Sequence, residues 1–379
     1  MTTMVENKDK KVLNAPHLRF PEFSGEWEKH TIGELCEEFK SGKNIKAENI
    51  QEGGVYPVFG GNGLRGYADR YNHEGDYVLI GRQGALCGNV RFVTGKTYIT
   101  EHAIAAKATN NNYTHFLEYL FVRLNLGQFS DQSAQPGLAV NKLLKIETFA
   151  PSKEEQYKIA SLLKFLDERI ATQNKIIEDL KKLKSAIAER VYNCRTYQLY
   201  RIGDVIEQVS KRNNSMSIDK VLSVSNKLGF INQSEQFEDR IVASEDTSNY
   251  KIVYKDDFAY NPARINVGSI ARLKHFNKGI VSPMYICFRV KQGIVLDYLE
   301  YFFTTNYFFN EMQKRLEGSV RQCLSFEGLC NIPIYIPNLD EQQKIGRKVS
   351  VIMEKIDNEN RYLDSLKMQK QYLLRQMFI

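Results

Sequence analysis

Side chains that can recognise the edges of nucleic-acid bases gather in two stretches of this 379-residue chain. Arginine can make paired hydrogen bonds to guanine, and asparagine or glutamine to adenine, while arginine and lysine also bind phosphates. Each candidate could equally be a solvated loop residue or make a hydrogen bond within a turn. We predict contacts with nucleic acid from Asn62, Arg65, Arg82, Gln83, Asn89 and Arg91 in the first stretch, and from Arg264, Asn266, Arg272, Arg321 and Gln322 in the second. Arg82-Gln83 and Arg321-Gln322, in polar loops with Gly or Ser, are the leading candidates.

Motifs for other chemistry fail in their context. Gly61 to Gly66 satisfies G-x-G-x-x-G, but Pro57 precedes it and no convincing helix follows, so a glycine-rich turn is the better interpretation than a dinucleotide site. Gly95-Lys-Thr97 lacks the first glycine of a phosphate-binding loop, since position 90 is Val. Asn261-Pro-Ala-Arg264 is only half of a methyltransferase motif. The histidines show no ligand spacing, and neither a nuclease metal motif nor G-x-S-x-G is present. We therefore predict binding rather than catalysis, with no catalytic residue and no metal.

The composition predicts a globular protein of the cytoplasm. The formal net charge is +7 and 42% of the residues are hydrophobic, which fits a folded chain with a polyanionic partner. No apolar run could span a bilayer, and the polar N-terminus is not a signal peptide. The six cysteines lie far apart without Cys-x-x-Cys, which indicates a reducing compartment rather than a zinc site or disulfides.

Two stretches 186 residues apart must position the candidate residues, because they repeat one helical pattern. Pro151 to Ile159 returns as Pro337 to Ile345, and apolar residues then recur at spacings of three and four, as in a coiled coil. Polar residues interrupt both seams at matching places: Gln173 and Lys184 in the first, Glu359 and Lys370 in the second. The predicted seam comprises Ile159, Leu163, Leu166, Ile170, Ile177, Leu180 and Ile187, with Ile345, Val349, Ile352, Ile356, Leu363, Leu366 and Leu373.

Each stripe could instead pack on its own domain, but the matched interruptions favour pairing of the two helices with each other. Each helix would be roughly 50 Å long. Connectivity favours an antiparallel pair, although the pattern itself does not exclude a parallel one.

The globular parts are repeated as well, so we predict an α+β fold of two mixed, strand-rich domains joined by two long antiparallel coiled-coil helices, with an internal pseudo-two-fold repeat. Ile32 to Phe39, which we predict to be a short helix, is echoed at Ile202 to Val209, and Leu117 to Phe121 is echoed at Leu299 to Phe303. The predicted segments are a disordered leader (1–14), a first domain (15–150), a first helix (151–195), a second domain (196–336) and a second helix (337–379).

The sequence resembles the specificity (S) subunits of type I restriction-modification systems over essentially its whole length. Pro16-x-Leu-Arg-Phe-Pro-x-Phe23 with Trp27 is typical of many members, as are Tyr56 to Gly66 and Gly81 to Gly88. Pro-x-x-x-Glu-Gln-x-x-Ile opens both long helices at Pro151 and Pro337, and the repeated domain-helix order is the most specific feature. Asn261 to Gly268 matches the glycine-rich pattern only loosely.

This resemblance implies that two target-recognition domains each read half of a bipartite site in double-stranded DNA. The helices would pair as a spacer and dock two methyltransferase (M) subunits, and two restriction (R) subunits would join for cleavage. S-adenosylmethionine, ATP and Mg²⁺ would belong to those partners, so this subunit would hold no cofactor. Two alternatives are a coiled-coil scaffold that holds two protein-interaction domains without DNA, and a stand-alone methyltransferase or nuclease, against which the missing motifs argue.

Overall fold

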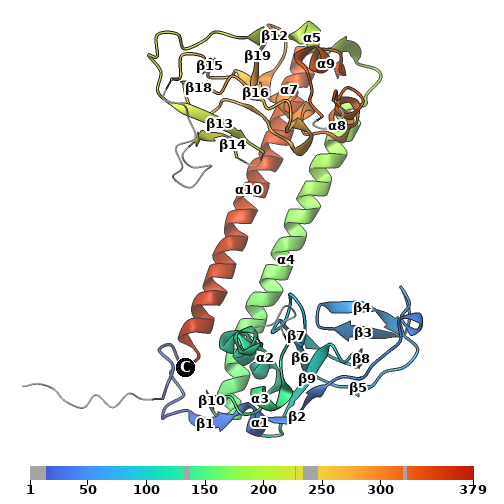
Figure 1. Cartoon of the computed structure of the whole chain (residues 1–379), viewed down its shortest axis with the longest axis vertical. Coiled ribbons are helices and arrows are strands. Elements are labelled where there is room, and N and C mark those ends of the chain that lie inside the picture. The colour runs from blue at the N-terminus through green and yellow to red at the C-terminus, as the bar shows by residue number, and fades with distance from the viewer. Residues whose placement is uncertain (1–13, 132–136, 227, 234–245, 319–321) are drawn as a thin grey trace, which may run out of the picture. The chain divides into compact units, whose positions relative to one another are not determined.

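The computed structural model describes residues 14–131, 137–226, 228–233, 246–318 and 322–379. Apart from Asn14, the predicted leader lies outside these residues. The chain forms two units, of which the first comprises residues 1–174 and 362–379 and the second comprises residues 175–361. Two long helices, α4 (Lys153–Tyr192) and α10 (Leu339–Gln376), each contribute to both units (Figure 1). They lie inside the predicted helical ranges, whereas the predicted division into domains stays a prediction.

The first unit is built on an antiparallel sheet, β2-β9-β6-β7, and a second sheet, β4-β3-β8-β5, in which β3 and β8 are parallel. A separate antiparallel pair, β1-β10, lies next to the start of α4 in the chain. The elements are β1 (Glu28–Thr31), α1 (Ile32–Leu35), β2 (Cys36–Ser41), η1 (Ala47–Asn49), β3 (Tyr56–Gly60), β4 (Gly63–Ala68), β5 (His73–Glu74), β6 (Tyr77–Gly81), β7 (Val90–Val93), β8 (Lys96–Ile99), β9 (Ala103–Ala108), α2 (Thr114–Leu124), η2 (Leu126–Phe129), α3 (Val140–Leu143) and β10 (Glu147–Ala150).

The second unit repeats this plan strand for strand. Its sheets are β12-β19-β16-β17, β14-β13-β18-β15 and β11-β20, and β13 and β18 form the corresponding parallel pair. The elements are β11 (Gln198–Arg201), α5 (Ile202–Val205), β12 (Ile206–Val209), β13 (Val221–Ser225), β14 (Gly229–Asn232), β15 (Lys251–Tyr254), β16 (Phe258–Tyr260), η3 (Ile265–Val267), β17 (Ile270–Arg272), β18 (Lys278–Val281), β19 (Ile286–Val290), α7 (Leu296–Phe302), α8 (Asn306–Gln313), α9 (Phe326–Cys330) and β20 (Pro333–Ile336).

The prediction of one short helix over Ile32 to Phe39 is wrong in its second half. The helix α1 ends at Leu35, and Cys36–Ser41 forms strand β2. A capping box fixes the helix start, because Thr31 and Glu34 exchange side-chain and backbone hydrogen bonds. Pairing of β2 with β9 then overrides the local helical spacing. The repeat shows the same transition, from α5 into β12.

An aromatic side chain near the end of a long helix completes the core of each unit. In the first unit the ring of Phe378 stacks on Phe116 at 5.3 Å and meets the edge of Trp27 at 6.3 Å. In the second unit Tyr192, 186 residues earlier, is fully buried against Tyr298, and its hydroxyl donates to the carbonyl of Tyr298 at 2.6 Å. Burial of such rings stabilises each unit by about 1.5–3 kcal/mol per side chain.

Two buried glutamines of the repeated motif join each long helix to its domain in the same way. Gln156 donates from Nε2 to the carbonyl of Pro151 at 2.9 Å and accepts at Oε1 from the backbone N–H of Tyr113, the N-cap of α2. Gln342 donates to Pro337 at 3.0 Å and accepts from Val295, the N-cap of α7, at 2.9 Å. A glutamine serves here because its amide both donates and accepts.

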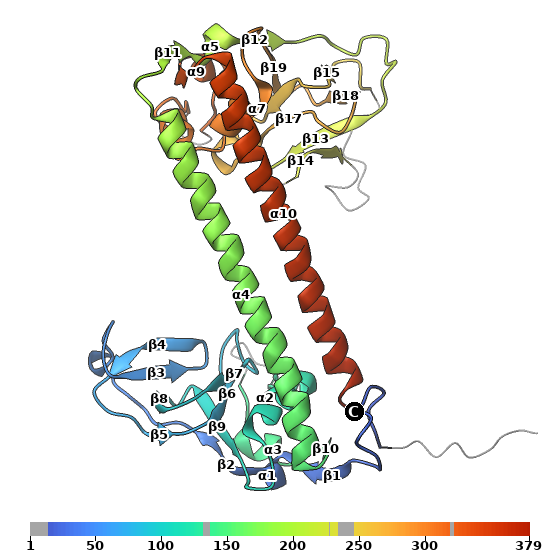
Figure 2. The same cartoon turned by 180° about the vertical axis from the view of Figure 1, so that it is seen from behind.

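Within each unit the segments of α4 and α10 run antiparallel, which Figures 1 and 2 show from opposite sides. In the first unit Asp167 of α4 accepts from Lys370 of α10 at 2.5 Å, and Arg169, further along α4, meets the earlier α10 residue Tyr362. In the second unit Lys184 of α4 lies near Asp357 of α10. Each lysine that interrupts the apolar seam therefore has an aspartate on the neighbouring helix. The predicted α+β class with two long antiparallel helices is confirmed.

None of the residues predicted for the seam is exposed. Ile159 and Leu163 belong to the core of the first unit, and Ile345 and Val349 to that of the second. The others are also buried or half-buried: Leu166, Ile170, Ile177, Leu180, Ile187, Ile352, Ile356, Leu363, Leu366 and Leu373. Near the first turns of each helix the seam thus also packs on the domain, so both interpretations of the stripe hold there.

Candidate nucleic-acid interface

Glycines bring three loops of the first unit together at one edge. The turn between β3 and β4 packs closely against the loop after β6. A Cβ added to Gly61 would lie 3.4 Å from the Gly81 Cα and only 2.7 Å from the His102 carbonyl oxygen. The same contact is sealed by the backbone N–H of Arg82, which donates to His102 at 2.9 Å. Only a residue without a side chain permits this approach. The glycine-rich stretch is therefore a packing device for the loops.

Three of the predicted residues converge on the β3–β4 turn. Asn62 is exposed at its tip. The exposed Arg91, from β7, lies with its guanidinium against Gly63, where a Cβ would be 3.0 Å from one of its nitrogens. The exposed Arg65, from β4, folds its aliphatic stem back over Gly60. Two guanidinium groups and one amide thus occupy one exposed edge, which is the arrangement that base and phosphate recognition uses.

Arg82 and Gln83 lie on the neighbouring loop, with different freedom. Arg82 is half-buried, and its Nε donates to the carbonyl of Leu138 at 3.4 Å. Gln83 is exposed, pairs with Gly137 in an isolated bridge and has its Oε1 3.3 Å from Nδ1 of His102. Asn89 is exposed where this loop enters β7. The structure therefore places every predicted residue of the first stretch on two adjoining loops and the strands that leave them.

His102 belongs to this edge, although its spacing from the other histidines did not select it as a candidate. Its ring is exposed beside Gln83, and its carbonyl holds Arg82. The apposition arises because β6 pairs with β9, so residues about 20 positions apart become neighbours. Leu64 and Leu86, which are 52% and 44% exposed, lie on the same loops and add apolar surface.

Two predicted residues of the second unit, Arg264 and Asn266, lie on the loop between β16 and β17, which corresponds to the β6–β7 loop of the first unit. Arg264 caps the short η3 helix and is exposed, as is Asn266. The loop is held against β13 because the Ser269 hydroxyl donates to the carbonyl of Val224 at 3.1 Å. Gln322 is exposed, whereas Arg321 lies outside the described residues.

Arg272 differs from the other predicted residues, because carboxylates hold its side chain. Its guanidinium lies 2.5 Å from Asp297 and 3.1 Å from Glu300 of α7, and the side chain is only 10% exposed. A guanidinium that is buried against two carboxylates has a structural role and little charge left for a phosphate. This placement argues against the prediction of a nucleic-acid contact at Arg272, and we leave it out of the interface.

Burial governs the chemistry of the titratable groups elsewhere. It raises the pKa of the thiols of Cys36 and Cys287 to about 12, so both remain protonated at neutral pH. All six cysteines are free. Among the described residues no group of three or more His, Cys, Asp or Glu side chains could hold a metal ion. No described helix is long and apolar enough to cross a membrane.

The two units repeat one plan of strand-rich domain and long helix, and their loops expose arginine and asparagine side chains. A family model described as the type I restriction modification DNA specificity domain matches residues 24–182 and again residues 195–368. The chain therefore belongs to this family of DNA specificity subunits. The description of this family names DNA specificity within type I restriction-modification.

Individual relatives carry the same description. The type I restriction enzyme EcoprrI specificity subunit of Escherichia coli is 39% identical over 180 residues, which cover 46% of this chain and 44% of that subunit. The chain thus spans less than half of that relative. The putative type I specificity subunit S.MgeORF438P of Mycoplasma genitalium is 22% identical, with 93% of this chain and 94% of the relative covered.

Solved structures show the same fold. The crystal structure of the type I S subunit from M. genitalium matches with a TM-score of 0.69 at 18% identity, and covers 96% of this chain and 99% of that one. A chain from a structure on complex assembly and conformational transition of the type I restriction-modification system matches with a TM-score of 0.53 at 14% identity, over 93% and 97% of the two chains.

Proposed function

We propose that the chain reads a bipartite sequence in double-stranded DNA, with one part recognised by each domain. The observation that carries this proposal is the convergence of Asn62, Arg65 and Arg91 on one exposed turn. The second unit presents Arg264 and Asn266 on the loop between β16 and β17, which corresponds to the β6–β7 loop that carries Arg82, Gln83 and Asn89 in the first unit. Two different sets of polar residues on one scaffold are what two different half-sites require.

In this proposal the two long helices set the distance between the two DNA half-sites. The chain runs from the last strand of the first domain, β10, through α4 into β11, and from β20 into α10. A paired helix resists bending, so adding or removing turns changes the separation of whatever it connects. Half-sites about one helical turn of DNA apart, roughly 34 Å, would present the same groove face to both domains.

We also propose which partner subunits assemble with this chain. Two methyltransferase and two restriction subunits would assemble with this chain in the cytoplasm and hold S-adenosylmethionine, ATP and Mg²⁺, while this chain holds none. Support comes from family membership and from an exposed cluster on the helices of the first unit. There Arg169 lies over the rings of Phe165 and Tyr362 at 5.7 and 5.9 Å, and both rings are more than 40% exposed. Such rings are common at interfaces.

Salt titration of DNA binding tests the proposal against a scaffold that does not use DNA. The DNA affinity of the purified chain, in complex with its methyltransferase partner, is measured between 50 and 200 mM salt for the sequence that the complex methylates and for unrelated duplexes. Over this range the affinity of a protein with six or more phosphate contacts falls by ~10³-fold. A steep fall together with preference for one sequence is expected. A flat dependence, or equal affinity for all duplexes, would contradict sequence recognition.

A further inference from the structure

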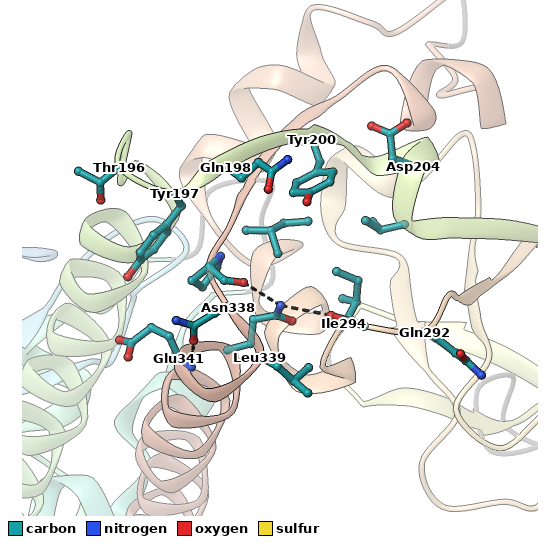
Figure 3. Close-up of a pocket in the computed structure, with 15 residues that line it drawn as sticks. Thr196, Tyr197, Gln198, Tyr200, Asp204, Gln292, Ile294, Asn338, Leu339 and Glu341 are labelled. Atoms are coloured by element: carbon teal, nitrogen blue, oxygen red, sulfur yellow. Dashed lines mark hydrogen bonds between the residues drawn. The ribbon is translucent and has the colours of Figure 1, made fainter.

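An open pocket of the second unit lies where β11, the approach to α7 and the start of α10 meet, and we call it the Glu341 pocket. It has a volume of about 830 Å³, and its lining includes Tyr197, Tyr200, Asp204, Ile294 and Glu341 (Figure 3). The backbone N–H of Glu341 is capped by Asn338 at 2.9 Å. The side chain of Glu341 is 38% exposed, and the cation that the structure pairs with it is Lys344 at 3.9 Å on the same helix.

The first unit has a pocket at the same place in the repeat. Its volume is about 560 Å³, and its lining includes His30, Glu34, Asn112, Pro151 and Glu155. Glu155 follows Pro151 by four residues, as Glu341 follows Pro337. His30 lies on β1 where Tyr200 lies on β11, and Glu34 lies in α1 where Asp204 lies in α5. The two pockets are thus one site that the duplication has copied.

An arginine occupies the first of these sites. Arg19 donates from Nε and from one terminal nitrogen to the two oxygens of Glu155 at 2.8 and 2.7 Å. Its other terminal nitrogen donates to the carbonyl of Gly25 at 2.5 Å. Glu155 is 1% exposed in this pair. This is a two-pronged ion pair, a geometry that a guanidinium makes and an ammonium does not.

No arginine is among the described residues that line the Glu341 pocket, and Arg195, which lies in the connection before it, is exposed outside the lining. Thirteen residues, 14–26, precede Trp27 in the described part of the first unit and carry Arg19. In the second unit the chain passes from the end of α4 at Tyr192 to β11 at Gln198 through residues 193–197 alone. The carboxylate of Glu341 therefore remains partly exposed where that of Glu155 is enclosed.

We propose that the Glu341 pocket binds an arginine side chain presented on a peptide segment of a partner protein. The carboxylate of Glu341 pairs with both prongs of the guanidinium, as Glu155 does with Arg19. The rings of Tyr197 and Tyr200 offer flat faces on which a guanidinium can stack. Ile294, Ile336 and Leu339 provide an apolar wall for neighbouring side chains. This binding is independent of DNA recognition and of the loops that carry it.

A peptide with the sequence of residues 16–25, labelled with a fluorophore, tests this proposal on the full chain. We expect saturable binding by fluorescence anisotropy, at least tenfold weaker for Glu341→Gln and for a peptide with Ala in place of its Arg. Glu354→Gln, at an exposed position on the same helix, is the matched control and should bind as the wild type does. Unchanged thermal melting of Glu341→Gln excludes misfolding. Absence of saturable binding, or equal binding by Glu341→Gln or by the Ala peptide, would overturn the proposal.

Discussion

At the scale of single residues, substitution of Arg91 distinguishes a contact with bases from a contact with phosphates. It is exposed, and its guanidinium lies against Gly63 of the β3–β4 turn, where its N–H groups can donate hydrogen bonds to base edges. Arg91→Ala should relax specificity in one half-site by about 1–3 kcal/mol and leave the other unchanged. Competition binding with single-base variants of the site measures this. Arg123→Ala, exposed on α2 outside the loops, is the control. A uniform loss across all sequences would instead make Arg91 a phosphate contact.

Arg272 should behave in the opposite way, because its partners are carboxylates of its own unit. Arg272→Ala removes the guanidinium from Asp297 and Glu300, although Glu300 keeps Lys274 at 2.8 Å. Because Asp297 is 38% exposed, we expect a cost of about 1–3 kcal/mol rather than that of a fully buried pair. We expect lower resistance to urea, with the relative preference among DNA sequences unchanged in the folded fraction. Wild-type stability in this variant would show that the ion pairs contribute nothing.

Glu118 makes the stability of the first unit depend on pH. Burial, and then the charge of Asp167, raises the pKa of its carboxyl from 4.5 to about 7. The folded state therefore binds the proton more tightly than the unfolded chain does, so stability is highest below pH 4.5 in respect of this group and falls as the pH rises to about 7.

Replacement of Glu118 by Gln should remove that fall and add about 1–2 kcal/mol at pH 8, after allowance for partial solvation. Urea unfolding is followed by the fluorescence of Trp27, the single tryptophan of the chain. Trp27 reports on this unit because it packs on Phe116, which lies in α2 together with Glu118. Glu168→Gln, exposed on α4, is the control. A fall of equal size in Glu118→Gln would assign the pH dependence to another group.

At the scale of elements, the buried glutamines of the repeated motif should contribute more to the free energy of unfolding than the residues next to them in the helix. Gln342→Ala leaves the partly buried backbone N–H of Val295 without its acceptor, which costs about 1 kcal/mol or more. The measurement is hydrogen exchange at Val295 together with urea unfolding. Gln343→Ala, exposed one position further along α10, should change neither. Equal effects of the two substitutions would show that the hydrogen bond between Gln342 and Val295 does not stabilise the contact of α10 with its domain.

The sequence predicts the elements well where a pattern repeats and poorly where a distant strand decides. The seam from Ile159 and from Ile345 follows from spacing alone, and so does the duplication. Cys36–Ser41 is predicted in part to be helical but forms a strand because it pairs with β9. Local spacing cannot show this pairing, since β9 lies more than 60 residues away in the chain. The candidate site divides likewise. Residue type selects Arg91 and Arg272 alike, and only the fold shows that Asp297 and Glu300 hold the second.

At the scale of the whole molecule, we propose that the long helices of the duplicated domains set the separation of two DNA half-sites. Each unit holds its own antiparallel pair of helical segments, joined by Lys370 to Asp167 in the first. A change of helix length that preserves the seam should thus alter the separation without touching either set of loops. Insertion of one heptad into α4 and a matching one into α10 meets this condition.

Mapping of adenine methylation in cells that carry this chain with its partner subunits tests that claim most directly. With the paired heptads inserted, the helices gain about 10 Å, so we predict a spacer about 3 base pairs longer between two half-sites whose bases are those of the wild type. An unchanged spacer, or altered bases in either half-site, would contradict the account.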